Sequence, residues 1–418
     1  MKIAIFGTTL YAAVMASLLA ECGHYIYACS NIDNPQKKGF DVREREVIQA
    51  LEQHIKAGFL SYCDFQNLPL DIDAYIFSFN HVEKEIALKV LDLINQRTII
   101  HPKLMINAST FGLNGTEQLQ ARLPQDQWVY LPDMVQEGQA FQSVLSLMRI
   151  IIGCNDEKAK IKLQEMLRPL FPRPQHYLFM PILDAEFTKL SISGMLATRI
   201  SYINDLAVVA EKVGVDINYV REGMGADSRI GGSYLYPGAG FGGENFSHDI
   251  LTLSTAVANT GVKSQLLTQV WEINEQQKEL MFRKLWNYFH GDLAGKTVAI
   301  WGAAFKVNTS SIQYSPIHPM LEALWAQGVK VQLHDPQALE EIRHYYGDRP
   351  DLILCEEQYA AVNNAHALCV LTAWKQYGSL DYKHLQRLMV HPLILDGRNI
   401  YDPAYIKEQG FAYIGVGR

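Results

Sequence analysis

The sequence has few cysteines, no excess of basic residues and no long apolar run. Its six cysteines include no CxxC pair, which disfavours a zinc site and indicates reduced thiols. A formal net charge of −7 disfavours general nucleic-acid binding. The longest apolar run, at residues 12–20, falls short of the roughly 18 residues that a membrane span needs, and no convincing signal-peptide cleavage site follows it. We therefore predict a soluble cytoplasmic protein with no nucleic-acid, membrane or metal partner.

What the sequence does contain is alternation of short apolar strands with helices. Residues 2–6 predict a strand, Gly7 a turn, residues 10–22 a helix and residues 25–29 a second strand. This is a βαβ unit, which is parallel and right-handed almost without exception. Further strands are expected at residues 74–79, 103–108 and 128–131. We predict a dinucleotide-binding, Rossmann-like domain over residues 1–185.

The pattern changes in the middle of the chain. Residues 184–213 have helical periodicity, residues 217–249 are rich in glycine, and residues 250–289 are helical again. We therefore predict an all-α domain over 186–290 that carries a functional loop. Alternation of strands and helices returns near Gly295, which predicts a second Rossmann-like domain over 291–418. The expected fold class is α/β, with two doubly wound domains joined by a central all-α domain.

The first strand–helix turn resembles a dinucleotide-binding turn in part. In the G-x-G-x-x-G/A pattern, Gly7 and Ala12 fit, but Thr9 places a side chain where the pyrophosphate approaches. The acidic residue expected after the second strand is missing, and Ser30 lies nearest to its place. These residues alone leave a dinucleotide site and a turn that binds nothing equally open.

Other polar residues follow expected strand ends or lie in the middle domain. Asp133 and Glu137 could act as general base and orienter, although a solvated loop is the more common role of such a pair. Lys189 and Ser193 share a helix face. The stretch 240–249 combines glycines with Asn, His and Asp side chains, which favours a ligand-binding loop.

These segments together resemble the UDP-glucose/GDP-mannose dehydrogenase family over essentially the whole chain. The segments that carry the resemblance are Ala185–Lys189 with Arg199–Asn204, Glu211–Asp216, Asp227–Gly231, Pro237–Gly243, Gly302–Thr309, Asp396–Asn399 and Gly415–Arg418. They are similar to that family's AE(L/M)xK…KISFxN, EKxGxD, DxRIG, PGxGYGG, GLAFKPxT, DGRN and GIGR motifs.

The resemblance implies an enzyme that oxidises the C6 alcohol of a nucleotide sugar to a carboxylate with NAD, for polysaccharide precursors. In that chemistry a cysteine captures the intermediate aldehyde. It also implies a homodimer held by the middle helices. Cofactor positions would be Gly7, Thr9, Leu10, Ser30 and Thr110; catalytic positions Thr110, Glu137, Lys189, Ser193, Asn245 and Asp249; substrate positions Asp133, Lys189, Arg229, Phe241, Gly242, Lys306 and Arg398.

Several of these positions depart from the family pattern. Asn245 stands at the cysteine position, Ser193 replaces an asparagine, and His248 replaces a lysine. We expect the covalent second oxidation to be lost or altered. Three alternatives stay open. The first is an enzyme that oxidises the alcohol once to an aldehyde, or that oxidises the aldehyde hydrate with Glu137 activating water. The second is a catalytically inactive nucleotide-sugar-binding paralogue or regulatory subunit, and the third is non-redox chemistry with His248 as acid or base.

Overall fold

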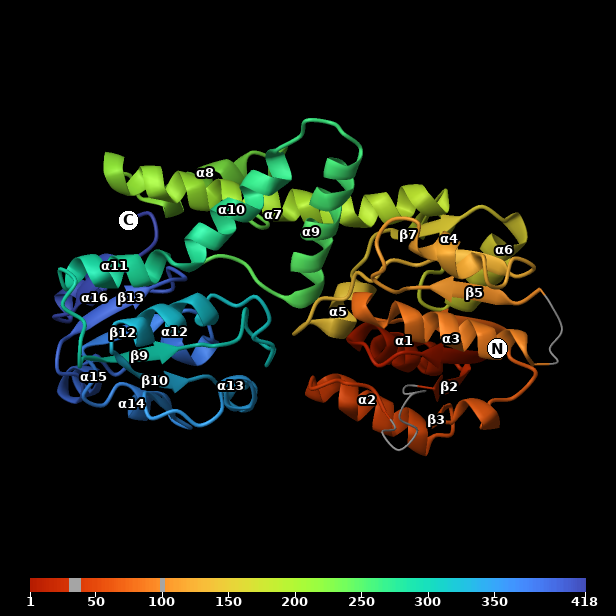
Figure 1. Ribbon diagram of the computed structural model, residues 1–418, viewed down its shortest axis with the longest axis horizontal. Coiled ribbons are helices and arrows are strands. Elements are labelled where there is room, and N and C mark those ends of the chain that lie inside the picture. Colours follow the sequence, from red (N-terminus) through yellow and green to blue (C-terminus); the bar gives the residue numbers. More distant parts are fainter. Residues whose placement is uncertain (30–38, 98–101) are drawn as a thin grey trace. The chain divides into compact units, whose positions relative to one another are not determined.

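The computed structural model describes residues 1–29, 39–97 and 102–418, which form two compact units. Unit 1 comprises Met1–Ile192 and unit 2 comprises Ser193–Arg418. The protein is an α/β protein with two largely parallel sheets and a central helical region, which confirms the expected fold class (Figure 1). The finer boundaries at residues 186 and 291 stay a prediction.

Unit 1 contains an eight-stranded sheet in the order β3-β2-β1-β4-β5-β6-β7-β8. All neighbouring strands are parallel except β6 and β7, so β7 and β8 run antiparallel to the rest of the predicted parallel sheet. Its strands are β1 Lys2–Phe6, β2 Tyr25–Cys29, β3 Leu60–Tyr62, β4 Ala74–Phe77, β5 Leu104–Asn107, β6 Gln127–Tyr130, β7 Ile150–Cys154 and β8 Tyr177–Met180. Its helices are α1 Leu10–Glu21, α2 Arg45–Lys56, α3 Lys84–Asn95, α4 Gly115–Gln120, α5 Ala140–Leu145 and α6 Glu157–Leu167, while α7, Ile182–Val213, contains the boundary between the units.

The core of unit 1 lies on both faces of this sheet. Alternate side chains of β1 point to opposite faces, so Ile3 and Ile5 join one apolar cluster while Ala4 and Phe6 join another. Helix α1 packs on the first of these faces, and ten consecutive residues of it are buried. Helices on both faces explain why the strands are continuous apolar runs in the sequence.

Unit 2 contains a six-stranded sheet in the order β11-β10-β9-β12-β13-β14, and every pair in it is parallel. Its strands are β9 Thr297–Trp301, β10 Lys330–His334, β11 Leu352–Leu354, β12 Ala367–Val370, β13 Leu393–Asp396 and β14 Ala412–Ile414. Its helices are α8 Ile217–Ala226, α9 Glu244–Asn259, α10 Leu266–Lys278, α11 Leu280–Tyr288, α12 Ile317–Ala326, α13 Leu339–Tyr346, α14 Gln358–Ala361, α15 Tyr382–Leu388 and α16 Pro403–Glu408.

The middle region corrects two expectations. The glycine-rich stretch 217–249 is not one loop, because α8 occupies its start and α9 begins at Glu244. Asn245 and Asp249 therefore lie on a helix. Gly243, with a φ of +96°, turns the chain immediately before that helix. The expected helical run over 250–289 is divided among α9, α10 and α11.

Two general features complete the description. In the part of the chain that the structure describes, no helix is long and apolar enough to cross a membrane. All six cysteines are described, and none is in a disulfide.

Candidate functional site

The β1–α1 turn is held tightly against the neighbouring strand β4. Gly7 has a φ of +107°, and a Cβ atom there would lie 1.8 Å from the carbonyl oxygen of Ser78. The Thr9 side chain caps α1 by accepting a hydrogen bond from the amide of Ala12 at 3.1 Å. The same hydroxyl lies 2.5 Å from the Ser78 hydroxyl. Leu10 is the first residue of α1, so the turn presents a helix N-terminus to a ligand. The Thr9 side chain lies at that N-terminus, where a ligand would approach it.

The strand order reverses direction at β1 and β4, which is where doubly wound sheets bind their ligands. Thr110 lies at this edge after β5, and its amide donates to the Phe79 carbonyl at 3.2 Å. Its hydroxyl is buried and has no hydrogen-bond partner within the described residues. A buried hydroxyl without a partner is unusual, and a bound ligand would supply one. Ser30 lies outside the described residues.

The two predicted acids after β6 have different surroundings. An Oδ1 atom of Asp133 accepts a hydrogen bond from the amide of Val135 at 2.9 Å, so this carboxylate shapes its own turn. Next to Glu137, the amide of Gly138 donates to Glu44 at 2.7 Å. Burial, and to a lesser extent the charge of Glu137, raises the pKa of Glu44. Sequence reasoning missed Glu44, since nothing in its spacing links residue 44 to residue 138.

The α7 segment of unit 1 carries Lys189 and a buried carboxylate. Glu186 is 2% exposed, and its Oε1 accepts a hydrogen bond from the amide of Thr116 at 2.8 Å. Burial raises the pKa of Glu186. Lys189 lies three residues further along the helix and is half-buried. Glu186 therefore fixes the helix against α4, and the catalytic role of Lys189 stays a prediction.

In unit 2 the structure brings together two of the predicted site residues. The hydroxyl of Ser193 donates to Oδ2 of Asp249 at 2.7 Å, and both side chains are buried. Asn245 lies four residues before Asp249 and so on the same face of α9. His248 points elsewhere on that helix, with Nε2 3.2 Å from the Thr252 hydroxyl.

The glycines before α9 are explained by contacts with protein atoms. A Cβ atom on Gly242 would lie 2.6 Å from the Tyr314 carbonyl oxygen, and one on Gly243 would lie 2.9 Å from the Phe305 ring. Phe241 is buried against Phe246, with ring centroids 5.2 Å apart. Glycine density therefore reflects close packing, and does not by itself indicate a ligand.

Arg398 is the most unusual charge in unit 2. Its guanidinium is half-buried and donates to the carbonyl oxygens of Leu371 at 2.6 Å, Gly240 at 3.3 Å and Phe305 at 3.4 Å. Burial lowers the pKa of Arg398 to about 10. The guanidinium connects the loop before α9 to the segments that follow β12 and β9, and the three acceptors are neutral backbone carbonyls.

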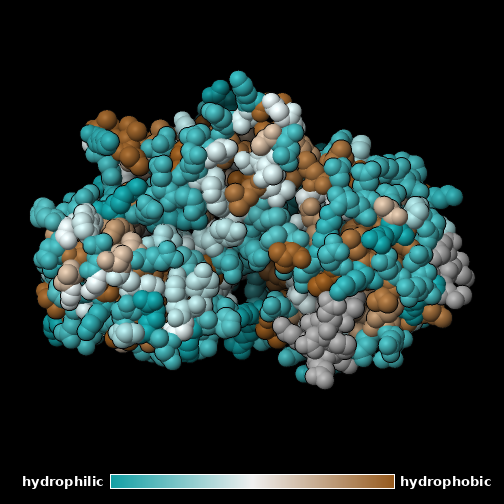
Figure 2. Space-filling model, in the orientation of Figure 1, coloured by the Kyte–Doolittle hydropathy of each residue, from teal (hydrophilic) through white to brown (hydrophobic). Residues whose placement is uncertain are grey.

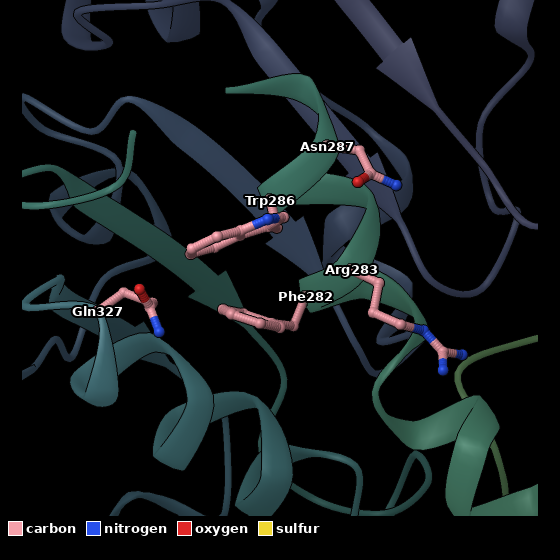
Figure 3. A pocket seen from close by; sticks show the side chains of 5 residues that line it. All are labelled: Phe282, Arg283, Trp286, Asn287 and Gln327. Atoms are coloured by element: carbon pink, nitrogen blue, oxygen red, sulfur yellow. The ribbon is translucent and has the colours of Figure 1, made fainter. Parts of the chain in front are cut away.

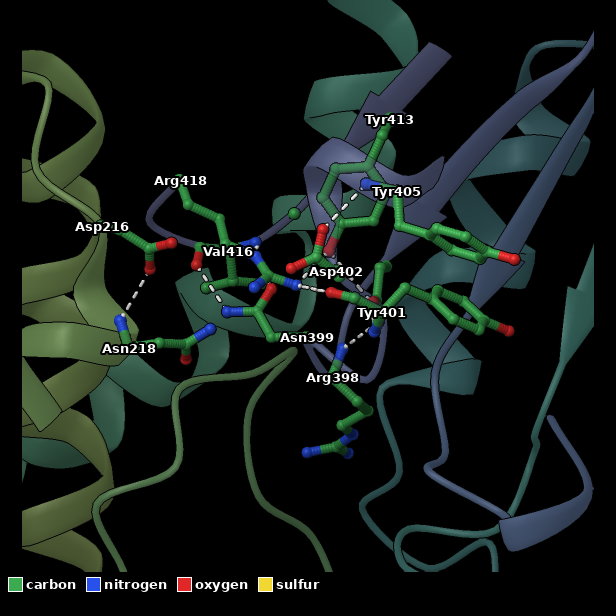
Figure 4. Close-up of polar contacts among 12 residues, drawn as sticks. Asp216, Asn218, Arg398, Asn399, Tyr401, Asp402, Tyr405, Tyr413, Val416 and Arg418 are labelled. Carbon is green, nitrogen blue, oxygen red and sulfur yellow. Dashed lines mark hydrogen bonds and ion pairs between the residues drawn. The ribbon is translucent and has the colours of Figure 1, made fainter. Parts of the chain in front are cut away.

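The remaining residues of the Asp396–Asn399 segment have structural roles (Figure 4). Asp396, which is fully buried, accepts hydrogen bonds from the amides of Arg398 and Tyr401 and from the Tyr413 hydroxyl. Burial raises the pKa of Asp396. Asn399 exchanges two hydrogen bonds with the backbone of Val416. The substrate-binding role of Arg398 stays a prediction.

Three further features lie outside this group. Arg229 is exposed and pairs with Asp227 of its own loop at 2.6 Å. Lys306 follows Phe305, with Nζ 5.5 Å from that ring. A pocket of about 400 Å³ on the face of α11 contains none of the predicted site residues (Figure 3). Its walls are Phe282, Arg283, Trp286, Asn287 and Gln327.

The chain was compared with known protein families, and two of its segments match domains of one family. Residues 183–276 match the central domain of the UDP-glucose/GDP-mannose dehydrogenase family, and residues 299–403 match its UDP binding domain. UDP-glucose 6-dehydrogenase of Pseudomonas aeruginosa is 39% identical over 293 residues, which span 69% of this chain and 64% of that protein. UDP-glucose 6-dehydrogenase TuaD of Bacillus subtilis is 28% identical over 100% of this chain and 93% of that protein.

A solved structure gives the same result. A UDP-glucose dehydrogenase from the archaeon Pyrobaculum islandicum superposes with a TM-score of 0.87 and 25% identity, over 99% of this chain and 96% of that one. The chain belongs to the UDP-glucose/GDP-mannose dehydrogenase family.

Proposed function

We propose that this protein oxidises the C6 alcohol of a nucleotide sugar once, to the aldehyde, with NAD as the hydride acceptor. UDP-glucose is the first substrate to test, because several relatives are named UDP-glucose 6-dehydrogenase. What supports the proposal is Asn245 on the first turn of α9, which the resemblance of its segment to the family's motif puts where the family carries its cysteine. A carboxamide is not a nucleophile toward an aldehyde, so no thiohemiacetal forms.

The residues of the β1–α1 turn fit a dinucleotide. Gly7 lets a ligand come close to the backbone, and the first amides of α1 offer hydrogen bonds to a pyrophosphate. The Thr110 hydroxyl is buried without a hydrogen-bond partner within the described residues, and a bound dinucleotide would supply one. When bound, the dinucleotide accepts a hydride from the substrate carbon. The Thr9 side chain narrows the space through which a pyrophosphate reaches the start of α1, so we infer that NAD binds weakly.

The remaining roles belong to side chains of this protein. The Lys189 ammonium would hold the C6 oxygen and stabilise negative charge on it as the hydroxyl proton leaves. Ser193, whose proton is donated to Asp249, would accept a hydrogen bond from a substrate hydroxyl in place of the family's asparagine. Lys306 and Arg398 would bind the diphosphate. Glu137 would take part only if the aldehyde hydrate were oxidised, by removing a proton from water.

The experiment is a survey of substrates. Purified protein is incubated with UDP-glucose, GDP-mannose or a UDP-N-acetylamino sugar and with NAD or NADP, while absorbance of the reduced cofactor is followed. We expect reduction with a nucleotide sugar, and its loss in Lys189→Ala but not in Lys383→Ala, a matched change on α15. Absence of reduction with every pair would contradict the proposal.

A second candidate, a non-catalytic nucleotide-sugar binder, is favoured by the Thr9–Ser78 hydroxyl contact at 2.5 Å. It predicts binding of the nucleotide sugar without binding of NAD. Calorimetric titration with each ligand separates the two candidates, since tight NAD binding would exclude the second.

We also propose a homodimer through α7. Met195, Tyr202 and Val209 are exposed at intervals of seven residues, and Val213 extends this apolar stripe by one turn. In Figure 2, apolar side chains gather over the α7 and α8 region at the upper left. An apolar stripe on one face of a helix is typical of a surface that packs against another helix.

A further inference from the structure

Two cysteines from neighbouring strands meet at the edge of the unit 1 sheet. Sγ of Cys29 lies 3.1 Å from Sγ of Cys63. Cys29 ends β2, and Cys63 follows β3 immediately. The contact is therefore between residues that are 34 positions apart in the sequence but adjacent in the sheet.

The backbone explains this contact. The parallel register pairs Ala28 with Tyr62, so Cys29 and Cys63 are the next pair along the two strands. The amide of Cys63 donates to the Ala28 carbonyl at 3.2 Å, which extends the ladder to this pair. Neighbouring strands lie about 4.8 Å apart, inside the Cα separations of about 4.4–6.8 Å that disulfides span. The strands need not move apart or slide for a bond to form.

The two thiols differ in access. Cys29 is 2% exposed and packs in the apolar cluster of Phe6 and Phe77, whereas Cys63 is only partly buried. The contact with Cys63 and burial raise the pKa of Cys29, so Cys29 remains a thiol at neutral pH. Cys63 is the sulfur that a reagent reaches first, and Cys29 lies directly behind it.

We propose that Cys29 and Cys63 form a peroxide-sensitive dithiol that closes to an intramolecular disulfide. A hydroperoxide accepts two electrons as its O–O bond breaks: the Cys63 sulfur becomes a sulfenic acid, and an alcohol or water leaves. The Cys29 sulfur then forms the S–S bond and displaces water from Cys63, with loss of the Cys29 proton. A dithiol reductant reverses the change. The site does not depend on the proposed dehydrogenase activity.

The test uses the full-length protein treated with hydrogen peroxide, denatured, alkylated and digested. We expect a peptide pair joined through Cys29 and Cys63, with the other four cysteines alkylated, and recovery of both thiols after dithiothreitol. In Cys63→Ser the joined pair disappears, whereas in Cys22→Ser, which alters another partly buried thiol, it persists.

Three outcomes would overturn the proposal. These are a different disulfide, overoxidation of Cys63 to sulfinic acid without a joined peptide, and two thiols that stay alkylatable after peroxide treatment. The wild-type mass spectrum gives this answer even if a serine variant fails to fold.

Discussion

At the residue scale, the proposed function depends on a few side chains in otherwise well-packed surroundings. The hydroxyl of Thr9 caps α1 and touches Ser78, and Asn245 is the second residue of α9. Their roles in cofactor binding and chemistry stay predictions, and the motif analysis placed Asn245 in a loop where the structure has a helix. Their contacts with the rest of the chain could not be derived from the sequence, because Ser78 belongs to no motif.

The first prediction concerns Thr9→Gly. Removing this side chain clears the approach to the start of α1, so we expect NAD affinity to rise about tenfold, equivalent to about 1.4 kcal/mol. Glycine is a tolerated N-cap residue, so the cost in stability is about a few tenths of a kcal/mol. Calorimetric titration of wild type, Thr9→Gly and Thr8→Ala gives the comparison. Equal affinities in wild type and Thr9→Gly would show that Thr9 does not limit binding.

At the element scale, glycines and a buried acid decide how helices meet their neighbours. The sequence located β1, β2, β4, β5 and β6 near their observed ends, since continuous apolar runs and glycine turns are local signals, but it gave no sign of β3, β8, β11 or β14. It placed residues 244–249 in a loop, because glycine density does not show that Gly242 and Gly243 pack against Tyr314 and Phe305. It also gave no sign of β7, whose antiparallel pairing with β6 depends on distant residues.

Gly243→Ala tests this packing. The residue has a φ of +96°, and its Cβ would lie 2.9 Å from the Phe305 ring, so we expect a loss of about 1–3 kcal/mol in unfolding free energy. Gly223→Ala on α8 is the control, since its Cβ has open space and alanine favours helix by about 1 kcal/mol. Urea denaturation measures both, and equal midpoints would refute the packing argument.

Glu186→Gln tests the buried carboxylate of α7. Its raised pKa means that the folded state holds a proton more tightly than the unfolded state. The folded state therefore binds more protons between the ordinary glutamate pKa and the raised one, and stability falls as pH rises through that window. Glutamine keeps the acceptor for the Thr116 amide without the charge. We expect the variant to lose part of this fall, as measured by urea denaturation from pH 4 to pH 7. If the unfolding free energy of Glu186→Gln varied with pH as that of the wild type does, the raised pKa of Glu186 would not be the cause of the fall.

At the scale of the whole molecule, two sheets and a helical region support a family assignment that short motifs indicated. The proposed homodimer belongs to this scale. Val209→Asp places a charge in the apolar stripe of α7, where it would be buried against a partner. We expect sedimentation velocity to show a dimer for wild type and a shift to monomer for the variant. Tyr345→Asp, an exposed change on α13, should leave the dimer intact. A monomeric wild type would contradict the proposed interface.

The most direct test of the account is the number of hydride equivalents taken from each nucleotide sugar. Limiting UDP-glucose, or whichever nucleotide sugar reacts, is exhausted with excess NAD, and the product is trapped with hydroxylamine. We expect one reduced NAD per sugar and a trapped aldehyde, and a second equivalent with a carboxylate product in Asn245→Cys. Two equivalents and a carboxylate from the wild-type protein would show that Asn245 does not stop the oxidation at the aldehyde.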